Sequence, residues 1–143
     1  MSVLLCYASN TIMERRKKVK YIFENERPIY VQLVEKIRIE IISGKLKSGE
    51  RIPSVRELAL TARVNPNTMQ KALAELENEG LVYTERTNGK FVTDNKELIE
   101  NIKKELAEEK VNNFLKDMQN IGITYKEALE YLQEIGGNSE WNY

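Results

Sequence analysis

Two helix-start signals, eleven residues apart, constrain this chain more than any other feature of its sequence. Residues 54–57 match a capping box, in which the Ser54 hydroxyl accepts a hydrogen bond from the Glu57 amide and the Glu57 carboxylate accepts one from the Ser54 amide. Asn65 and Pro66 form the second signal, because asparagine caps helices well and proline is favoured at the first helical position. The sequence therefore predicts two short helices with a turn of about four residues between them.

A third helix is predicted upstream, with Pro28 in its first turn and Gly44 at its end. Its apolar residues recur at helical spacing, at Tyr30, Leu33, Val34, Ile37 and Ile41. The helix that begins after Asn65 carries a similar stripe, of Met69, Ala72, Leu73 and Leu76, and stops at Gly80. A chain of 143 residues is expected to form one compact core around such stripes, with room for a helical appendage.

The pattern changes from helical to β-prone after Gly80. Residues 81–85 and 90–93 have strand composition, and the tight-turn signal Asn88-Gly89 lies between them, which predicts a hairpin. Residues 51–53 are also expected to be extended, because the residue before a proline is pushed out of the helical region. A hairpin beside a helix-turn-helix is a wing, so the sequence predicts a winged helix-turn-helix between about residues 28 and 93.

Two further helices are predicted after the wing. The first begins near Asn95 and stops at Gly122, and a second capping box at residues 124–127 opens a shorter helix that we expect to end at Gly136-Gly137. The expected fold class is mainly α with a small β-hairpin: a winged helix-turn-helix domain followed by a two-helix C-terminal dimerisation segment.

The apolar faces of these two helices are larger than the pair can bury by itself, which favours a homodimer. The residues expected at the dimer interface are Leu98, Ile102, Leu106, Val111, Phe114, Leu115, Met118, Leu129 and Leu132. The alternative is that both helices fold back on the winged domain of their own chain.

The predicted organisation has four parts: a flexible leader (1–24), the winged domain (25–94), the two-helix dimerisation and effector segment (95–137) and a flexible tail (138–143). Residues 1–12 carry no charge and precede a second methionine, so they are consistent with a misplaced start. The basic run at residues 15–20 either contacts DNA phosphates as an arm or is a solvated leader.

Composition excludes several classes of protein. The chain has no histidine and a single cysteine, so neither a metal site, a histidine-based catalytic site nor an internal disulfide is expected. No glycine-rich phosphate loop or nucleophile motif is present, so we predict neither an enzyme nor a cofactor. No segment is apolar for long enough to span a membrane, and a cytoplasmic location is expected.

The charges are distributed unevenly although they sum to zero. Residues 13–95 carry 16 basic and 12 acidic side chains, whereas residues 96–143 carry 6 and 10. A net charge of +4 on the first of these segments is compatible with a nucleic-acid partner but is also common on solvated helices.

The polar face of the helix after Asn65 is the candidate DNA-reading surface, because amides, hydroxyls and amines pair with base edges and phosphates. Arg56 is placed at a helix start, where a cation and the helix end together favour phosphate. The hairpin tip offers cations beside a glycine that a phosphate can approach closely. The full set of expected DNA contacts is Ser54, Arg56, Asn65, Pro66, Asn67, Thr68, Gln70, Lys71, Arg86, Thr87, Asn88, Gly89 and Lys90.

These motifs together resemble the GntR family of winged helix-turn-helix regulators. The resemblance rests on residues 44–59, which include the string Arg51-Ile52-Pro53-Ser54, on residues 64–81, and on Gly89-x-Phe91-Val92. The Asn-Pro-Asn-Thr segment (65–68) and the short two-helix C-terminal part resemble the YtrA-like subfamily.

The resemblance implies a dimeric repressor that reads an inverted repeat through Arg56, the N-terminus of the helix after Asn65, and the wing. It also implies control of a neighbouring membrane-transporter operon. Two departures stand out: Pro66 replaces an arginine that many relatives use for a base contact, and Thr87 replaces the first glycine of the wing. The roughly fifty residues after Thr93 leave little room for a ligand cavity, so a small-molecule effector, if the protein has one, is expected at the dimer interface or between domains.

The function predicted from the sequence is a DNA-binding transcription regulator that acts as a homodimer on duplex DNA. Two alternatives remain open. The first is a winged-helix replication or segregation protein, and the second is a protein-interaction adaptor whose winged domain does not bind DNA.

Overall fold

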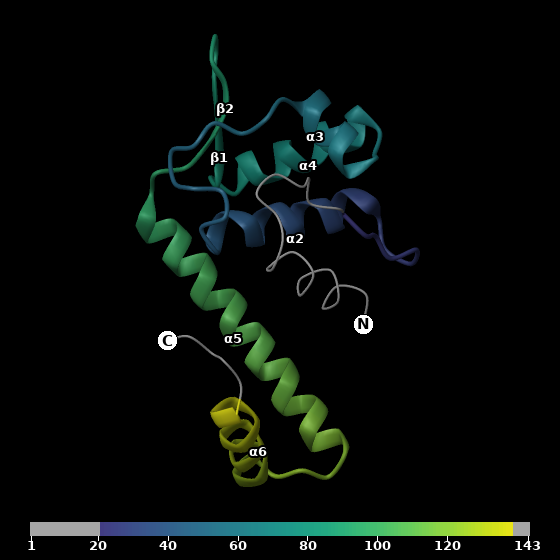
Figure 1. Ribbon diagram of the computed structural model, residues 1–143, viewed down its shortest axis with the longest axis vertical. Coiled ribbons are helices and arrows are strands. Elements are labelled where there is room, and N and C mark those ends of the chain that lie inside the picture. The colour runs from purple at the N-terminus through teal and green to yellow at the C-terminus, as the bar shows by residue number, and fades with distance from the viewer. Residues whose placement is uncertain (1–20, 139–143) are drawn as a thin grey trace. The chain divides into compact units, whose positions relative to one another are not determined.

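The computed structural model describes residues 21–138 of the chain. The elements in this range are α2 (Ile29–Ile42), α3 (Val55–Ala62), α4 (Pro66–Asn78), β1 (Val82–Glu85), β2 (Gly89–Val92), α5 (Lys96–Asn120) and α6 (Tyr125–Asn138) (Figure 1). The strands form one antiparallel two-stranded sheet. The predicted fold class, mainly helical with one small hairpin, is confirmed.

The chain forms two compact units that divide between Glu100 and Asn101, inside α5. The sequence placed this boundary between residues 94 and 95. The first turn of α5 belongs to the winged unit because the Leu98 side chain packs against Gly80, with its Cδ2 atom 3.2 Å from the position that a Cβ would take there.

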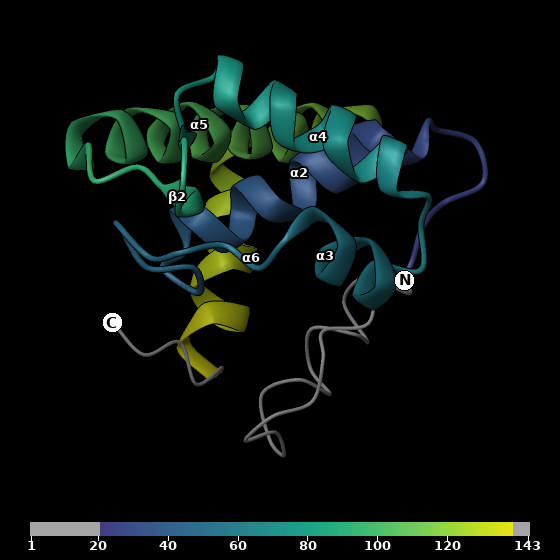
Figure 2. The same cartoon turned by 90° about the horizontal axis from the view of Figure 1, so that it is seen from above.

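The core of the winged unit lies around α4, which packs against α2, α3 and β1 (Figures 1 and 2). The side chains that are fully buried come from the predicted stripes, from the strands and from the residue before β1; they include Leu33, Ile37, Met69, Leu73, Leu76, Leu81 and Val92. Arg38 of α2 also pairs with Glu79 at the end of α4, where its Nε donates to the carboxylate at 2.9 Å. Apolar burial and this ion pair together fasten α4 to α2.

The two helix starts form as the sequence indicates. Ser54 Oγ accepts from the Glu57 amide at 3.2 Å, and the Glu57 carboxylate accepts from the Ser54 amide at 3.1 Å. Asn65 Oδ1 accepts from the Asn67 amide at 2.8 Å and caps α4. The turn between α3 and α4 contains Arg63 in the left-handed conformation, with φ of +56°, a feature that the sequence did not indicate.

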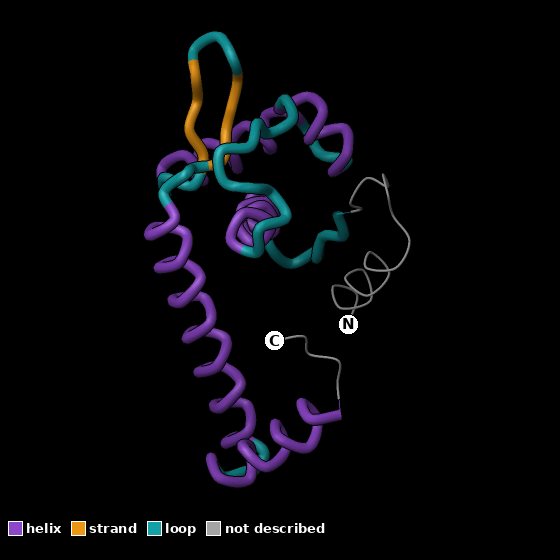
Figure 3. The backbone as a smooth tube through the Cα atoms, turned by 60° about the vertical axis from the view of Figure 1, so that its left-hand side comes forward, coloured by secondary structure: helices purple, strands orange, loops and turns teal. Residues whose placement is uncertain are grey.

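The hairpin pairs Val82 with Val92 and Glu85 with Gly89 (Figure 3). Gly89 has a φ of +97°, which a residue with a side chain rarely adopts. The extended segment before α3 runs along the other edge of β2. Its backbone bonds join the Gly49 amide to the Val92 carbonyl at 3.0 Å and the Ile52 amide to the Lys90 carbonyl at 2.8 Å, so β2 is held on both sides.

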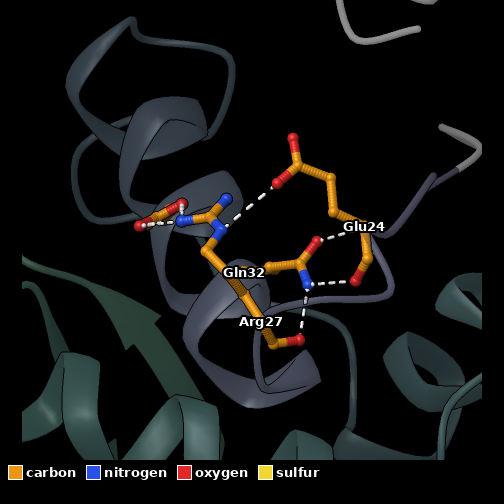
Figure 4. A network of polar contacts seen from close by, with 4 residues as sticks. Glu24, Arg27 and Gln32 are labelled. Carbon is orange, nitrogen blue, oxygen red and sulfur yellow. Dashed lines mark hydrogen bonds and ion pairs between the residues drawn. The ribbon is translucent and has the colours of Figure 1, made fainter.

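The residues just before α2 are anchored to that helix by the buried side chain of Gln32 (Figure 4). Its amide nitrogen donates to the carbonyls of Glu24 and Arg27, both at 2.8 Å, and its oxygen accepts from the Glu24 amide at 2.7 Å. Arg27 in turn pairs with Glu35 at 2.9 Å. This network fixes the entry into α2 without a side-chain cap on the helix itself.

Tyr21 lies beside Glu40 of α2 and donates a hydrogen bond to its carboxylate at 3.3 Å. Both groups line a cavity of about 180 Å³ together with Ile52 and Leu58. Burial raises the pKa of Glu40, and the hydrogen bond from Tyr21 offsets part of that increase. Residues 21–24, which the sequence assigned to the leader, therefore contact α2; residues 1–20 and the basic run at 15–20 lie outside the described residues.

The C-terminal unit contains most of α5 and all of α6. The second capping box is confirmed, because Thr124 Oγ1 accepts from the Glu127 amide at 3.2 Å. The prediction that Gly136-Gly137 ends the last helix is wrong, since α6 continues to Asn138. Glycine inside a helix costs about 1 kcal/mol relative to alanine but leaves its amide free to donate, so it weakens a helix without ending it.

Candidate nucleic-acid interface

The helix α4 has one buried and one exposed side. Met69, Leu73 and Leu76 are completely buried against the core, whereas Asn67 and Gln70 are exposed. The other predicted contacts on this helix are distributed as follows: Asn65, Pro66 and Lys71 are exposed and Thr68 is half-buried. A polar face on the second helix of a helix-turn-helix can enter a groove of duplex DNA.

Two residues of this face also have roles inside the protein. The Asn65 side-chain oxygen is occupied by the cap of α4, so its amide nitrogen is the group that remains for a ligand. The Lys71 ammonium lies 3.7 Å from the centre of the Tyr30 ring on α2, a cation–π contact that leaves the lysine exposed.

The start of α3 presents Arg56, which is exposed. Within residues 21–138 no ion pair of Arg56 is formed. Ser54 is exposed as well, with its hydroxyl engaged in the capping box. Figure 1 shows α3 and the hairpin at the same end of the winged unit, above α2.

The tip of the hairpin consists of the exposed residues Arg86, Thr87 and Asn88. The Asn88 amide nitrogen donates to the Glu85 carboxylate at 3.0 Å across the turn. Lys90 differs from these tip residues, because its ammonium donates to Thr84 Oγ1 at 2.8 Å and pairs with Glu77 of α4 at 3.4 Å. The Lys90 side chain is only 16% exposed.

Arg51 is a cation of this surface that the list of expected contacts omitted. It is exposed, and its guanidinium lies beside Gly89, with Nε 3.5 Å and Nη2 3.6 Å from the position a Cβ would take there. The sequence contained a signal for it, since Arg51 belongs to the segment predicted to be extended next to Pro53. What the sequence lacked was the pairing of that segment with β2.

The C-terminal unit carries the second predicted surface. No residue of α5 is buried, and Ala128 is the one buried residue of α6. Among the expected interface residues, Val111, Leu129 and Leu132 are 55%, 40% and 51% exposed. Ile102, Leu106, Phe114, Leu115 and Met118 are half-buried, and Leu98 packs on the winged unit.

Further apolar residues extend this surface beyond the expected list. Tyr125 and Ile135 on α6 are 66% and 68% exposed. An open hollow of about 470 Å³ lies within the same unit, lined by Leu115, Met118, Ile123 and Tyr125 among others. Its volume is in the range of small-molecule sites, which the sequence did not lead us to expect.

Comparison with known proteins decides what kind of domain carries this surface. Residues 29–92 match the family model described as "Bacterial regulatory proteins, gntR family". The chain is 37% identical over 108 residues to an uncharacterized HTH-type transcriptional regulator, YhcF, from Bacillus subtilis. The aligned region covers 76% of this chain and 89% of YhcF. The chain belongs to the GntR family.

A second relative is the HTH-type transcriptional repressor YtrA of Bacillus subtilis, 34% identical over 78% of this chain and 86% of YtrA. The fold matches that of a GntR family transcriptional regulator from Listeria monocytogenes, with a TM-score of 0.74 and 38% identity over 78% of this chain and 98% of the other. A DNA-binding domain of AraR, solved in complex with its operator ORX1, aligns with a TM-score of 0.50 and 28% identity over 55% of this chain and 100% of that domain.

The resemblance to the GntR family and to YtrA is thereby confirmed. Because the family and the relatives are transcription regulators, this GntR protein is a regulator and not an enzyme. Within residues 21–138, no three side chains of the types that bind metals are grouped closely enough to hold an ion. No helix in the same range has the length and apolar character to cross a membrane.

Proposed function

We propose that this GntR protein is a cytoplasmic homodimeric repressor that binds an inverted repeat in duplex DNA. The observation that carries the proposal is the division of α4 into a fully buried apolar face and an exposed polar face. In a helix-turn-helix the second helix enters the major groove with its N-terminal residues near the base edges. The exposed residues in the N-terminal half of α4 have the side chains for that role.

The contacts divide by chemistry. The amides of Asn67 and Gln70 fit the donor and acceptor pattern of adenine, whereas Lys71 reaches a guanine edge or a phosphate. Arg56 is free to contact phosphate or guanine at the start of α3. The wing residues Arg86 and Asn88 bind the backbone beside the groove.

The C-terminal unit supports a dimer. Tyr125, Leu129 and Leu132 follow one another at helical spacing and are each at least 40% exposed, which is unusual for a side of a helix that faces water. A twofold dimer places two reading helices in the same relation as the halves of an inverted repeat. The relatives add support, since YtrA is named a repressor and the AraR domain was solved on operator DNA.

The test is a selection of randomised duplex DNA on the purified protein at about 150 mM salt, where specific binding exceeds the general attraction to phosphate. We expect enrichment of an inverted repeat, and loss of enrichment in Asn67→Ala. Asn78→Ala, at the far end of the same helix and exposed, is the matched control and should retain it.

Other results would favour the alternatives. Enrichment of unpaired or directly repeated sites would contradict a twofold dimer on an inverted repeat and favour a replication or segregation protein. An absence of salt-sensitive binding to any duplex would contradict the proposal and favour a protein-interaction adaptor.

A further inference from the structure

Within the proposed DNA-binding function, we propose that Arg51 is the cation beside the hairpin tip that contacts the DNA backbone, and that Lys90 is a positioning residue that holds the hairpin against α4. The sequence suggests the reverse, because Lys90 belongs to the hairpin and Arg51 lies far from it along the chain. The contacts of the two side chains distinguish the roles.

Lys90 is occupied by contacts from two other elements. Its ammonium donates to Thr84 on β1 at 2.8 Å and pairs with Glu77 on α4 at 3.4 Å, and Thr84 lies directly opposite Lys90 in the sheet. To contact a phosphate, the ammonium would have to leave the Glu77 carboxylate and a site where it is 16% exposed. An ammonium held in this way orients the hairpin relative to the reading helix.

The environment of Glu77 keeps its ion pair with Lys90 intact at neutral pH. A hydrogen bond from the Thr84 hydroxyl and the nearby charge of Lys90 hold the pKa of Glu77 below its ordinary value. The carboxylate is therefore ionised at neutral pH. Glu77, Thr84 and Lys90 join α4, β1 and β2 at one point.

Arg51 has the opposite character. Its backbone is fixed by the hydrogen bonds of residues 49–52 to β2, while its side chain is exposed and forms no ion pair within the described range 21–138. The guanidinium lies beside Gly89, which has no side chain to cover it. A guanidinium presents a fork of N–H donors that matches a phosphate, so Arg51, with its backbone held by β2 and its guanidinium beside Gly89, forms an anion site next to the hairpin tip.

The salt dependence of DNA binding tests this assignment. Each phosphate contact contributes about 0.9 to the slope of log affinity against log salt for B-DNA, whereas a residue that only orients the wing contributes nothing to the slope. Affinities would be measured for a duplex of about 30 base pairs over a series of salt concentrations. Arg51→Gln should reduce the slope by about 0.9, and Lys90→Gln should weaken binding several-fold with the slope unchanged.

Exchanging the two charges distinguishes a structural ion pair between Lys90 and Glu77 from a contact between Lys90 and DNA. Lys90→Glu alone should weaken binding, and the double variant Glu77→Lys with Lys90→Glu should recover it, because the exchanged pair restores the link between α4 and the hairpin. If Lys90 contacted DNA, the double variant would remain as weak as the single one. Lys116→Gln, which removes one exposed cation from α5, is the control for a general effect of charge.

Each outcome has a defined meaning. A slope that falls by about 0.9 in Lys90→Gln, or is unchanged in Arg51→Gln, overturns the inference while leaving the proposed function intact. A wild-type protein that binds no duplex overturns the proposed function and the inference with it. Thermal melting of every variant shows that it is folded at the assay temperature; should Lys90→Gln unfold, the charge-exchanged protein, in which the pair is restored, supplies the affinity and slope instead.

Discussion

The winged unit and the C-terminal unit of this GntR protein bury their apolar residues to very different degrees. In the winged unit, Leu33, Met69, Leu73 and Leu76 have no exposed surface, whereas in α6 the leucines at 129 and 132 are 40% and 51% exposed. Each unit contains a helix that begins with a capping box. The difference is that α2, α3 and α4 enclose a core. The two helices of the C-terminal unit, α5 and α6, have too few neighbouring elements to enclose one.

The comparison shows that helix formation and core formation are separate properties. A capping box begins α3 and α6 alike, yet only the first of these helices contributes to a closed core. We therefore expect substitutions in the winged unit to change the free energy of unfolding. Substitutions on the apolar face of α6 should change self-association instead.

The largest expected effect is that of Leu73→Ala. Leu73 is fully buried at the centre of α4, so truncation leaves a cavity and should lower the free energy of unfolding by about 2–5 kcal/mol. Urea denaturation monitored by circular dichroism measures the change. Leu60→Ala is the matched control, because Leu60 is 72% exposed and its truncation should be nearly neutral. Equal losses in both variants would contradict the described core.

The next effect concerns association. Leu132→Asp places a charge on the exposed apolar face of α6 and should convert the proposed dimer to a monomer, with a loss of at least about tenfold in affinity for the proposed inverted repeat. Sedimentation velocity and DNA binding measure the two changes. Gln133→Asp introduces the same charge at the adjacent exposed position and should leave the dimer intact. A Leu132→Asp protein that still dimerises would place the interface elsewhere.

The helix caps allow a direct comparison of the two units. Ser54→Ala and Thr124→Ala each remove an acceptor for an orphan amide at a helix start, and each should cost about 1 kcal/mol. Thermal unfolding measures the effect of the first, and hydrogen exchange of the Glu127 amide measures that of the second. A control is Ser43→Ala, at the C-terminal end of α2, which should change neither. If Thr124→Ala has no measurable effect, α6 is stabilised by packing against a partner subunit and not by its N-terminal cap.

The smallest expected effect is a dependence of stability on pH. Burial raises the pKa of Glu40 in the folded state, so the folded state favours the protonated form more than the unfolded state does. The stability due to this group is present below the ordinary pKa of a glutamate and is lost as pH rises through the folded pKa. Glu40→Gln removes that loss and should be the more stable protein at neutral pH.

Denaturation at pH about 7 and about 4 checks this prediction, and the advantage of Glu40→Gln should shrink at the lower value. Glu26→Gln, at an exposed glutamate just before α2, is the control and should show no such difference. An advantage that grows on acidification would contradict the sign of the Glu40 shift.

The sequence by itself determined the local features of this protein. The starts of α3, α4 and α6 follow from Ser54, Asn65 and Thr124, since a cap is a contact between residues two or three apart. The hairpin follows from Asn88-Gly89 for the same reason. The family resemblance also followed from such short strings of residues, because they carry the helix-turn-helix.

Only the tertiary structure decided which side chains are available to DNA. Lys90 meets Glu77 across 13 residues of sequence, and Arg51 reaches Gly89 because residues 49–52 pair with β2. Neither contact can be predicted from the spacing of neighbouring residues in the sequence, because both depend on how separate elements pack. The same holds for the exposed face of α6: its periodicity predicts an apolar surface, and whether that surface is covered depends on what packs against it.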